Sequence, residues 1–546
     1  MQSRRINIAT TGCILILTFS GCANQTTPTG GPRDEKPPLL ISSVPAQNQK
    51  NFKGKKLQLT FSEDVQLREP KEQILITPTI GKEIIYSAKK NSILIEPEND
   101  WKDSTTYSIQ FRESVRDLTE GNPALNLKLA FSTGSTIDSL SLSGNVHFAL
   151  SEKIPEDITV AIYKEDTFDI FKHTPNYFTK INKLGKFRIE NLKQGNYYIY
   201  AFDDKNKNLK IESTTEKYAF LEKPVFLSTN RDSLALNLIN LDTRPIKLNS
   251  VRSNAKTTTI RFNKLLSAYT TTFQKPQPTT HFFGTNTSEI TFYQYVELNA
   301  MDSIPVQLHV TDSLNQSLDS VVYLKTSDNK YVPEKFALSI APPEIDLETS
   351  TLSISGKSNK PIRIFILDSL IIKLDTGRTL SMSKEDIQND TINKIFKIYK
   401  KLDLKNLKPP VEEIKFKYGK GFIISMEGDS SKTSNATLSI YKPENLGTLS
   451  VEIKTTHKDF VVELLSSENK VIRSFKNKSK HLFLNLAPQE YKIRCYADKN
   501  QNGQWDPGNF YTHTEPEPTY FYQTPEKKFT FPIRANWELG PLVLTF

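Results

Sequence analysis

Alternation of apolar and polar residues with a period of two recurs along most of the chain. It is clear in Leu-Gln-Leu-Thr-Phe at 57–61, in Val-Gln-Leu-His-Val at 306–310 and in Gly-Thr-Leu-Ser-Val-Glu-Ile at 447–453. Such alternation is typical of a strand with one buried face. Stretches rich in Gly, Asn, Asp and Pro separate these short strands at the spacing of β-sandwiches. The pattern therefore predicts an all-β chain built from tandem β-sandwiches.

One segment, 384–402, fits two patterns. Ile387 and Ile395 belong to a series of apolar residues near helical spacing, which would favour a helix. Phe396 and Ile398 alternate with lysines, which would favour a strand. The sequence leaves both alternatives open.

The N-terminus has the features of a secretory signal. Arg4 and Arg5 precede a short apolar run, 6–19, which is followed by Ser-Gly-Cys22. Small residues before a cysteine resemble the bacterial lipobox, although Phe19 stands where that motif usually has Leu. The resemblance implies lipid attachment to Cys22 and an envelope protein anchored by lipid, in the outer membrane. The alternatives are a plain cleaved signal with an incidental cysteine, and lipidation at Cys13.

Breaks in the strand pattern divide the chain into seven parts. They are a signal peptide at 1–21, a Gly- and Pro-rich lipidated tether at 22–38, and five β-sandwiches at 39–134, 138–240, 241–342, 343–442 and 443–546.

The first sandwich resembles a known module. Its segments Pro-Pro-Leu-Leu-Ile-Ser-Ser-Val-Pro-Ala, Leu-Thr-Phe-Ser-Glu-Asp-Val and Arg-Asp-Leu-Thr-Glu-Gly-Asn are similar to the bacterial Ig-like domain of the S-layer-protein (SbsA) type. With the tether, they resemble Ig-like-domain lipoproteins of Bacteroidota. In that family the domain is structural, which implies a similar role here. The third and fourth sandwiches are expected to be diverged Ig-like units.

The second and last sandwiches look like copies of one module. Residues 191–208 align without a gap with 485–502, and the two stretches share Asn-Leu at the start, a central Tyr and the ending Asp-Lys-Asn-x-Asn. Internal duplication is the simplest explanation. Both units resemble transthyretin-like or carboxypeptidase-regulatory-like sandwiches, which are not catalytic.

Charge and cysteine content exclude some classes of function. The net charge is +10, but no block of five or six basic residues occurs, so we expect no nucleic-acid partner. After removal of the signal and lipidation of Cys22, Cys495 has no partner for a disulfide. Its strand-like surroundings predict a buried, inert thiol.

The clearest candidate for chemistry is a loop that begins at Asp498. In the spacing of a calcium loop, oxygen ligands come from positions 1, 3, 5, 7 and 9, with Gly at position 6. Gly503 is at position 6, and position 12 holds Asn509 in place of the bidentate Glu. The candidate calcium ligands are Asp498, Asn500, Asn502, Gln504 and Asp506. The alternative is an ordinary Asx-rich turn without metal.

The first copy retains part of this set. Its candidate ligands are Asp204, Asn206, Asn208 and Glu212. Leu209 stands where Gly is wanted, so the first loop fits calcium less well. Calcium is the only candidate cofactor, and none is required by the sequence.

Catalytic patterns are missing from the sequence. The seven histidines are scattered, and neither a GxSxG elbow nor a phosphate-binding Gly-rich loop occurs. The neighbouring acids Asp203–Asp204 and Glu515–Glu517 are interpreted as solvated loop residues. We therefore expect no enzyme, but a membrane-anchored stalk, adhesin or scaffold. The alternatives are a glycan-binding or glycan-processing envelope protein and an accessory subunit of an outer-membrane machine, with envelope proteins or glycans as partners.

Overall fold

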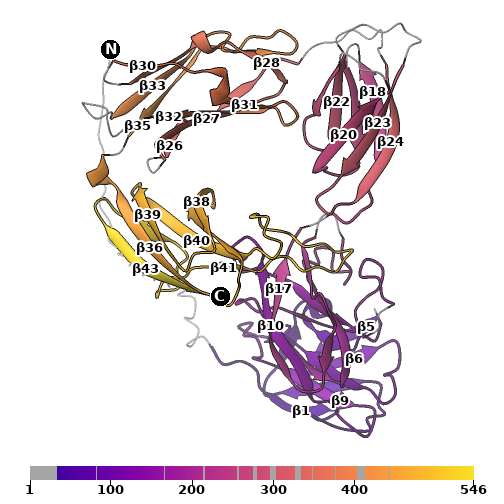
Figure 1. The fold of residues 1–546 in the computed structure, drawn as a ribbon. Helices are drawn as coiled ribbons and strands as arrows, with labels where there is room; N and C mark the ends of the chain where they lie inside the picture. The colour runs from indigo at the N-terminus through magenta and orange to yellow at the C-terminus, as the bar shows by residue number, and fades with distance from the viewer. Residues whose placement is uncertain are drawn as a thin grey trace, which may run out of the picture. The chain divides into compact units, whose positions relative to one another are not determined.

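The computed structural model describes residues 34–546 except 82, 165–166, 213–215, 241, 255–256, 275–278, 295–302, 326–333, 347–348, 375–376, 403–411 and 441. The chain forms two compact units, up to Ser135 and from Thr136 on, apart from residues 77–79 and 106–108, which cluster with the second. Nearly all regular structure is strand, and each described helix, such as α1 (Pro70–Gln73), is a single short turn (Figure 1). The prediction of an all-β chain of tandem sandwiches is confirmed.

The N-terminal sandwich contains three sheets. Their strand orders are β1-β2-β6-β5, β3-β8 and β4-β7-β9. The strands are β1 (Leu40–Val44), β2 (Leu57–Phe61), β3 (Val65–Leu67), β4 (Leu75–Thr77), β5 (Ile84–Lys89), β6 (Ser92–Pro97), β7 (Thr106–Gln110), β8 (Val115–Asp117) and β9 (Lys128–Ser132).

Asp117 organises the turn formed by the Arg-Asp-Leu-Thr-Glu-Gly-Asn segment, residues 116–122. The Asp117 carboxylate is buried and accepts hydrogen bonds from the backbone N–H groups of Glu120, Gly121 and Asn122, at 2.7, 2.8 and 2.9 Å. Burial alone would raise the pKa of Asp117, but these donors bind the ionised form and lower it. Asp117 therefore closes the turn that follows β8, and its role is structural.

The second sandwich packs two sheets. One has the order β13-β10-β17, and the other has the order β12-β11-β14-β15, with β16 also paired to β14. The strands are β10 (Leu140–Phe148), β11 (Thr159–Tyr163), β12 (Tyr177–Lys180), β13 (Lys186–Leu192), β14 (Gly195–Phe202), β15 (Tyr218–Phe220), β16 (Val225–Leu227) and β17 (Arg231–Leu238). Within the first sheet β10 and β17 run parallel.

The last sandwich repeats this arrangement strand for strand. Its sheets have the orders β39-β36-β43 and β38-β37-β40-β41, with β42 paired to β40, and β36 runs parallel to β43. The strands are β36 (Gly447–Lys454), β37 (Phe460–Ser466), β38 (Val471–Lys476), β39 (Lys480–Leu486), β40 (Gln489–Ala497), β41 (Thr519–Phe521), β42 (Phe531–Ile533) and β43 (Glu538–Thr545). The strand orders of the two units are therefore equivalent, as the predicted duplication requires.

The third sandwich has two sheets, β18-β19-β22-β21 and β20-β23-β24. Its strands are β18 (Leu248–Asn254), β19 (Thr257–Phe262), β20 (Ala268–Phe273), β21 (Thr279–Phe283), β22 (Glu289–Gln294), β23 (Ile304–Thr311) and β24 (Ser317–Leu324).

The fourth sandwich has the sheets β25-β27-β32-β31, with β26 on β27, β30-β29-β33-β35, and the pair β28-β34. Its strands are β25 (Leu338–Ile340), β26 (Glu344–Asp346), β27 (Thr351–Ser358), β28 (Ile362–Phe365), β29 (Leu370–Leu374), β30 (Thr379–Leu380), β31 (Ile387–Asp390), β32 (Ile395–Lys401), β33 (Glu413–Tyr418), β34 (Ile423–Ser425) and β35 (Ser434–Ser439). The segment 384–402 is thus mainly strand, because Phe396 and Ile398 enter the core while Lys397 between them is exposed.

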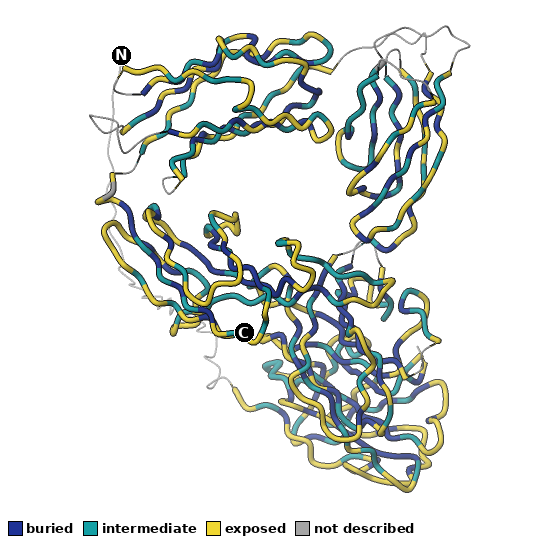
Figure 2. The backbone as a smooth tube through the Cα atoms, in the orientation of Figure 1, coloured by how far each residue is buried: buried dark blue, intermediate teal, exposed yellow. Residues whose placement is uncertain are grey.

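Each sandwich buries one face of its strands, and Figure 2 shows buried and exposed residues alternating along them. Tyr197 of β14 and Tyr491 of β40 occupy equivalent core positions and are each 1% exposed. Each hydroxyl donates to the backbone carbonyl four residues earlier, Lys193 at 2.6 Å and Ala487 at 2.9 Å. In both copies the tyrosine hydroxyl therefore holds, by a hydrogen bond, the turn that precedes its strand.

We expect Tyr197→Phe to lower the opening free energy of β14 by about 1 kcal/mol, because the change removes a buried hydrogen bond but little volume. Tyr218→Phe is the matched control, since its buried hydroxyl has no hydrogen-bond partner and its loss should be neutral or stabilising. Hydrogen exchange of β14 amides measures both variants. Equal losses in the two variants would contradict the structural role of the Tyr197 hydroxyl.

Candidate functional site

The lipid site predicted at Cys22, like the signal peptide at 1–21 and most of the tether, lies outside the described residues. No helix in the described part of the chain combines the length and the apolar character needed to cross a membrane.

The loop after β40 folds around Asp498, as the calcium-loop spacing requires. Asp498 is 4% exposed, and its Oδ2 accepts the Gly503 N–H at 2.9 Å. Asn500 Oδ1 accepts the Asn502 N–H, and Asn502 Oδ1 accepts the Gln504 N–H, at 3.1 and 2.7 Å. These hydrogen bonds form successive Asx turns, which is the alternative that the sequence left open.

The carboxylate of Asp506 closes the other side of this loop. Its Oδ2 accepts hydrogen bonds from the side-chain amides of Asn500 and Asn502, at 2.6 and 2.9 Å. The predicted residues at positions 1, 3, 5 and 9 therefore gather in one loop. Asn509, at position 12, instead pairs with Thr514 through its backbone and donates its side-chain amide to the Leu314 carbonyl.

Sequence reasoning missed Glu517 in this site. Glu517 is 4% exposed, and its carboxylate accepts the N–H groups of Lys499 at 2.6 Å and Asp506 at 3.1 Å. Burial raises the pKa of Glu517, and repulsion from Asp506 and Asp498 raises it further. The interpretation of Glu517 as a solvated loop acid is wrong, because β41 returns the chain to β40 and carries Glu517 inside.

The first loop has the same plan. Glu216 is 1% exposed and accepts the N–H groups of Lys205 at 3.0 Å and Glu212 at 2.8 Å. Asp204 is also buried, so the interpretation of this residue as solvated is wrong too. In both copies the missed Glu stands two residues before a strand that ends in Phe, at 216–220 and 517–521, and this spacing could have identified it.

The two loops differ in how many carboxylate oxygens of their first Asp, Asp204 or Asp498, accept a hydrogen bond. In the first loop, Asp204 Oδ1 accepts the Asn208 N–H at 2.9 Å and Oδ2 accepts the Leu209 N–H at 3.0 Å. In the second loop, Asp498 Oδ1 is buried and has no hydrogen-bond partner. Burial raises the pKa of Asp204, although its two backbone donors oppose that shift. Among the described residues, no three carboxylate, imidazole or thiol groups already stand close enough together to hold a metal ion.

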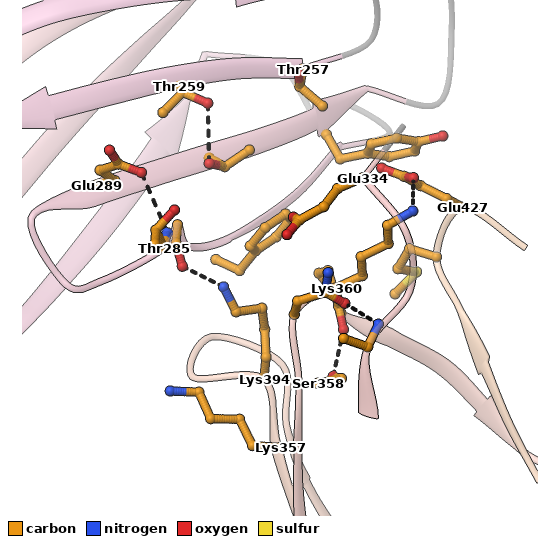
Figure 3. A pocket seen from close by; sticks show the side chains of 18 of the residues that line it. Thr257, Thr259, Thr285, Glu289, Glu334, Lys357, Ser358, Lys360, Lys394 and Glu427 are labelled. Carbon is orange, nitrogen blue, oxygen red and sulfur yellow. Dashed lines mark hydrogen bonds and ion pairs between the residues drawn. The ribbon is translucent and has the colours of Figure 1, made fainter. Parts of the chain in front are cut away.

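A second candidate is a pocket of about 750 Å³ lined by the third and fourth sandwiches (Figure 3). Its Lys360 ammonium lies 2.5 Å from Glu427 Oε2 and 2.8 Å from Asp429 Oδ2. Lys394 donates to the carbonyls of Phe283 and Gly284. Burial lowers the pKa of Lys394. Both ammonium groups are thus engaged by groups of the protein itself.

Cys495 is fully buried in β40, and its thiol points to the Tyr520 carbonyl at 3.7 Å. Burial raises the pKa of the Cys495 thiol. Since the thiolate is the nucleophile, this cysteine is an inert core residue, as predicted.

Comparison with known families identifies one part of the chain. Residues 34–133 match the model of the bacterial Ig-like domain, in agreement with the resemblance seen in the sequence. That match covers the N-terminal sandwich only. No curated protein matches the chain.

Solved structures similar to this chain include an S-layer protein, a pilin subunit and the ectodomain of a desmocollin. The S-layer protein rSbsC is 10% identical, with 84% of this chain and 63% of that chain covered and a TM-score of 0.13. BcpA, the major pilin subunit of Bacillus cereus, is 9% identical, with 75% and 99% covered and a TM-score of 0.12. The human desmocollin-1 ectodomain is 10% identical, with 88% and 97% covered and a TM-score of 0.15. The chain spans less than two thirds of the length of the S-layer protein, and TM-scores this low support no argument about function.

The backbone conformation at position 6 of each loop predicts how substitutions there affect stability. Leu209 and Gly503 both adopt positive φ, 58° and 76°, a conformation that favours Gly. Gly503→Ala should lower the free energy of unfolding of the last sandwich by about 1 kcal/mol. Urea unfolding followed by the fluorescence of Trp505 and Trp537 measures it.

Leu209→Gly is the reciprocal variant and should relieve strain in the first loop, seen as slower hydrogen exchange of the 204–212 amides. The same sign of effect in both variants would contradict this account of the turn.

Proposed function

We propose that the chain is a non-catalytic lipoprotein of the cell envelope that acts as a stalk, adhesin or scaffold. The observation that carries the proposal is the architecture: the described residues form one β-sandwich after another, with little regular structure besides strands. The signal and the lipobox-like cysteine of the sequence supply the anchor for such a string of modules.

Buried charges support a structural role. Lys264 and Asp312 are almost completely buried, and their side chains form an ion pair at 2.5 Å. Lys264 also donates to the backbone carbonyls of Asp242 and Arg244. The Lys264 ammonium thus has three acceptors, and it links the start of the third sandwich to the turn after β23.

The anchor can be tested by metabolic labelling with a clickable fatty acid. Wild-type protein should carry the label and partition with membranes. Cys22→Ala should lose the label and release the protein to the soluble fraction, because the thiol that carries the lipid is gone. Cys13→Ala is the matched control and should keep both properties. Label that persists in Cys22→Ala would overturn the lipoprotein assignment.

A glycan-binding role is the second candidate, favoured by the pocket lined by the third and fourth sandwiches (Figure 3). Its lining includes the aromatic Tyr293 and the polar Arg252 and Asn254. Glycan arrays probed with the full chain would detect binding, and chromatography of the same glycans would detect cleavage. Binding without cleavage would favour an adhesin. Cleavage would replace the non-catalytic proposal with an enzyme, and copurification of defined outer-membrane proteins would favour an accessory subunit.

A further inference from the structure

Three carboxylates of the last sandwich share one loop. Asp498, Asp506 and Glu517 come from positions as much as 19 residues apart. Glu517 bridges the N–H groups of Lys499 and Asp506, which are the second and ninth residues of the loop. Two of the three carboxylates, Asp498 and Glu517, are each 4% exposed. Negative charge that is both buried and shared in this way is destabilising unless a cation balances it.

Asp498 provides a second, independent observation. Its Oδ2 is fixed by the Gly503 N–H, while its Oδ1 is buried and makes no hydrogen bond. A buried carboxylate oxygen without a partner is unusual in a folded protein, because its desolvation is not compensated. In calcium loops of this spacing, the first Asp offers one oxygen to the ion. Asp498 Oδ1 is the atom available for that contact.

The neutral oxygens needed to complete a coordination sphere are in the same loop. Asn500 and Asn502 now direct their side-chain NH₂ groups at Asp506 Oδ2. A half-turn of each amide would replace the NH₂ donor with an oxygen, at the cost of the Asx-turn bonds that those oxygens now accept. The Gln504 backbone carbonyl is the seventh-position ligand in this spacing. The carboxylates do not yet stand at coordination distances, so binding would draw the loop inward.

We propose that this loop binds one calcium ion through Asp498, Asp506, Glu517, the Asn500 and Asn502 side chains and the Gln504 carbonyl. Calcium accepts six to eight oxygen ligands in a flexible geometry, whereas magnesium requires a near-ideal octahedron and keeps much of its water. The affinity of a calcium site depends on the number of charged ligands and on how rigidly they are held. Since this loop must rearrange to bind, we expect a dissociation constant of about 10⁻⁴ to 10⁻³ M, as in extracellular modules.

The first loop is not part of the proposal. Both oxygens of Asp204 accept backbone N–H groups, so no oxygen of that carboxylate lacks a partner. The loop is closed by its own hydrogen bonds. The structure therefore assigns one calcium ion to each chain, although the two loops descend from one module.

Calcium would act on a loop that also packs outside its own sandwich. Trp505 and Phe510 lie against a hydrophobic cluster that contains Tyr218 and Phe220 of the second sandwich. The Trp505 indole N–H donates to the Glu517 carbonyl at 2.8 Å. Binding that orders Glu517 would thus also hold the Trp505 ring, which places a fluorescent reporter beside the site.

The test is calcium titration of the full chain, purified in detergent, by calorimetry and by terbium luminescence sensitised by Trp505. We expect one site and competition between terbium and calcium. Saturating calcium should raise the melting temperature of the last sandwich by about 2–4 °C. Asp506→Asn and Asp498→Asn should each weaken binding at least tenfold, because each removes a charged ligand but keeps an oxygen acceptor.

Asp459→Asn is the matched control. Asp459 contacts the loop through Gln501 but is not one of the proposed ligands, so its variant should bind calcium within twofold of wild type. Asp204→Asn should also leave affinity and stoichiometry unchanged. Calcium-free melts of the variants establish that they fold. No binding at 10 mM calcium, or binding that survives both Asp498→Asn and Asp506→Asn, would overturn the proposal, whereas neither result bears on the lipid anchor.

Discussion

The last sandwich depends on the pairing of its two central strands, β37 and β40. Val462 lies opposite Cys495 and Leu464 opposite Ile493, and all four are fully buried. Burial of these side chains fixes the register, since a slip of one residue would turn each of them out of the core. The register in turn fixes where β40 ends, and therefore where Asp498 leaves the sheet.

The second sandwich obeys the same constraint with different residues. Val160 lies opposite Ala201 and Ile162 opposite Ile199 in the pair β11–β14. Because the buried strand pairs fix the register of each sandwich, the loops that follow them can differ in sequence. One copy keeps a strained Leu209 and a fully bonded Asp204, while the other has Gly503 and leaves an oxygen of Asp498 unbonded. The two loops therefore differ in the hydrogen bonding of their first Asp, although Leu209 and Gly503 at position 6 both adopt positive φ.

Buried ion pairs recur outside the apolar cores. Lys360 with Glu427, and Lys492 with Glu152, have ammonium–carboxylate distances of 2.5 Å and side chains less than one fifth exposed. Removing both charges from water is expensive, so such pairs contribute little net stability. Loss of one partner would leave an uncompensated charge inside the fold. Each pair therefore favours the one packing arrangement that keeps its two side chains in contact.

The sequence by itself determined the class of fold, the duplication and most of the candidate loop. Period-two alternation reports which residues face a core, and the gapless repeat carried Tyr197 and Tyr491 to equivalent positions. The spacing from Asp498 to Asp506 also follows from local turn chemistry. These features depend on residues close together in the chain, so a linear pattern can reveal them.

Only the tertiary structure decided which acids lie inside the candidate loop. Glu517 is separated from Asp506 by ten residues that have no counterpart of equal length in the first copy, and it enters the loop because β41 pairs with β40. Whether a hydrogen-bond donor lies near Asp498 Oδ1 depends in the same way on the path of the chain between the loop and β41. Burial and partnership of a carboxylate are set by long-range packing, which local sequence does not encode.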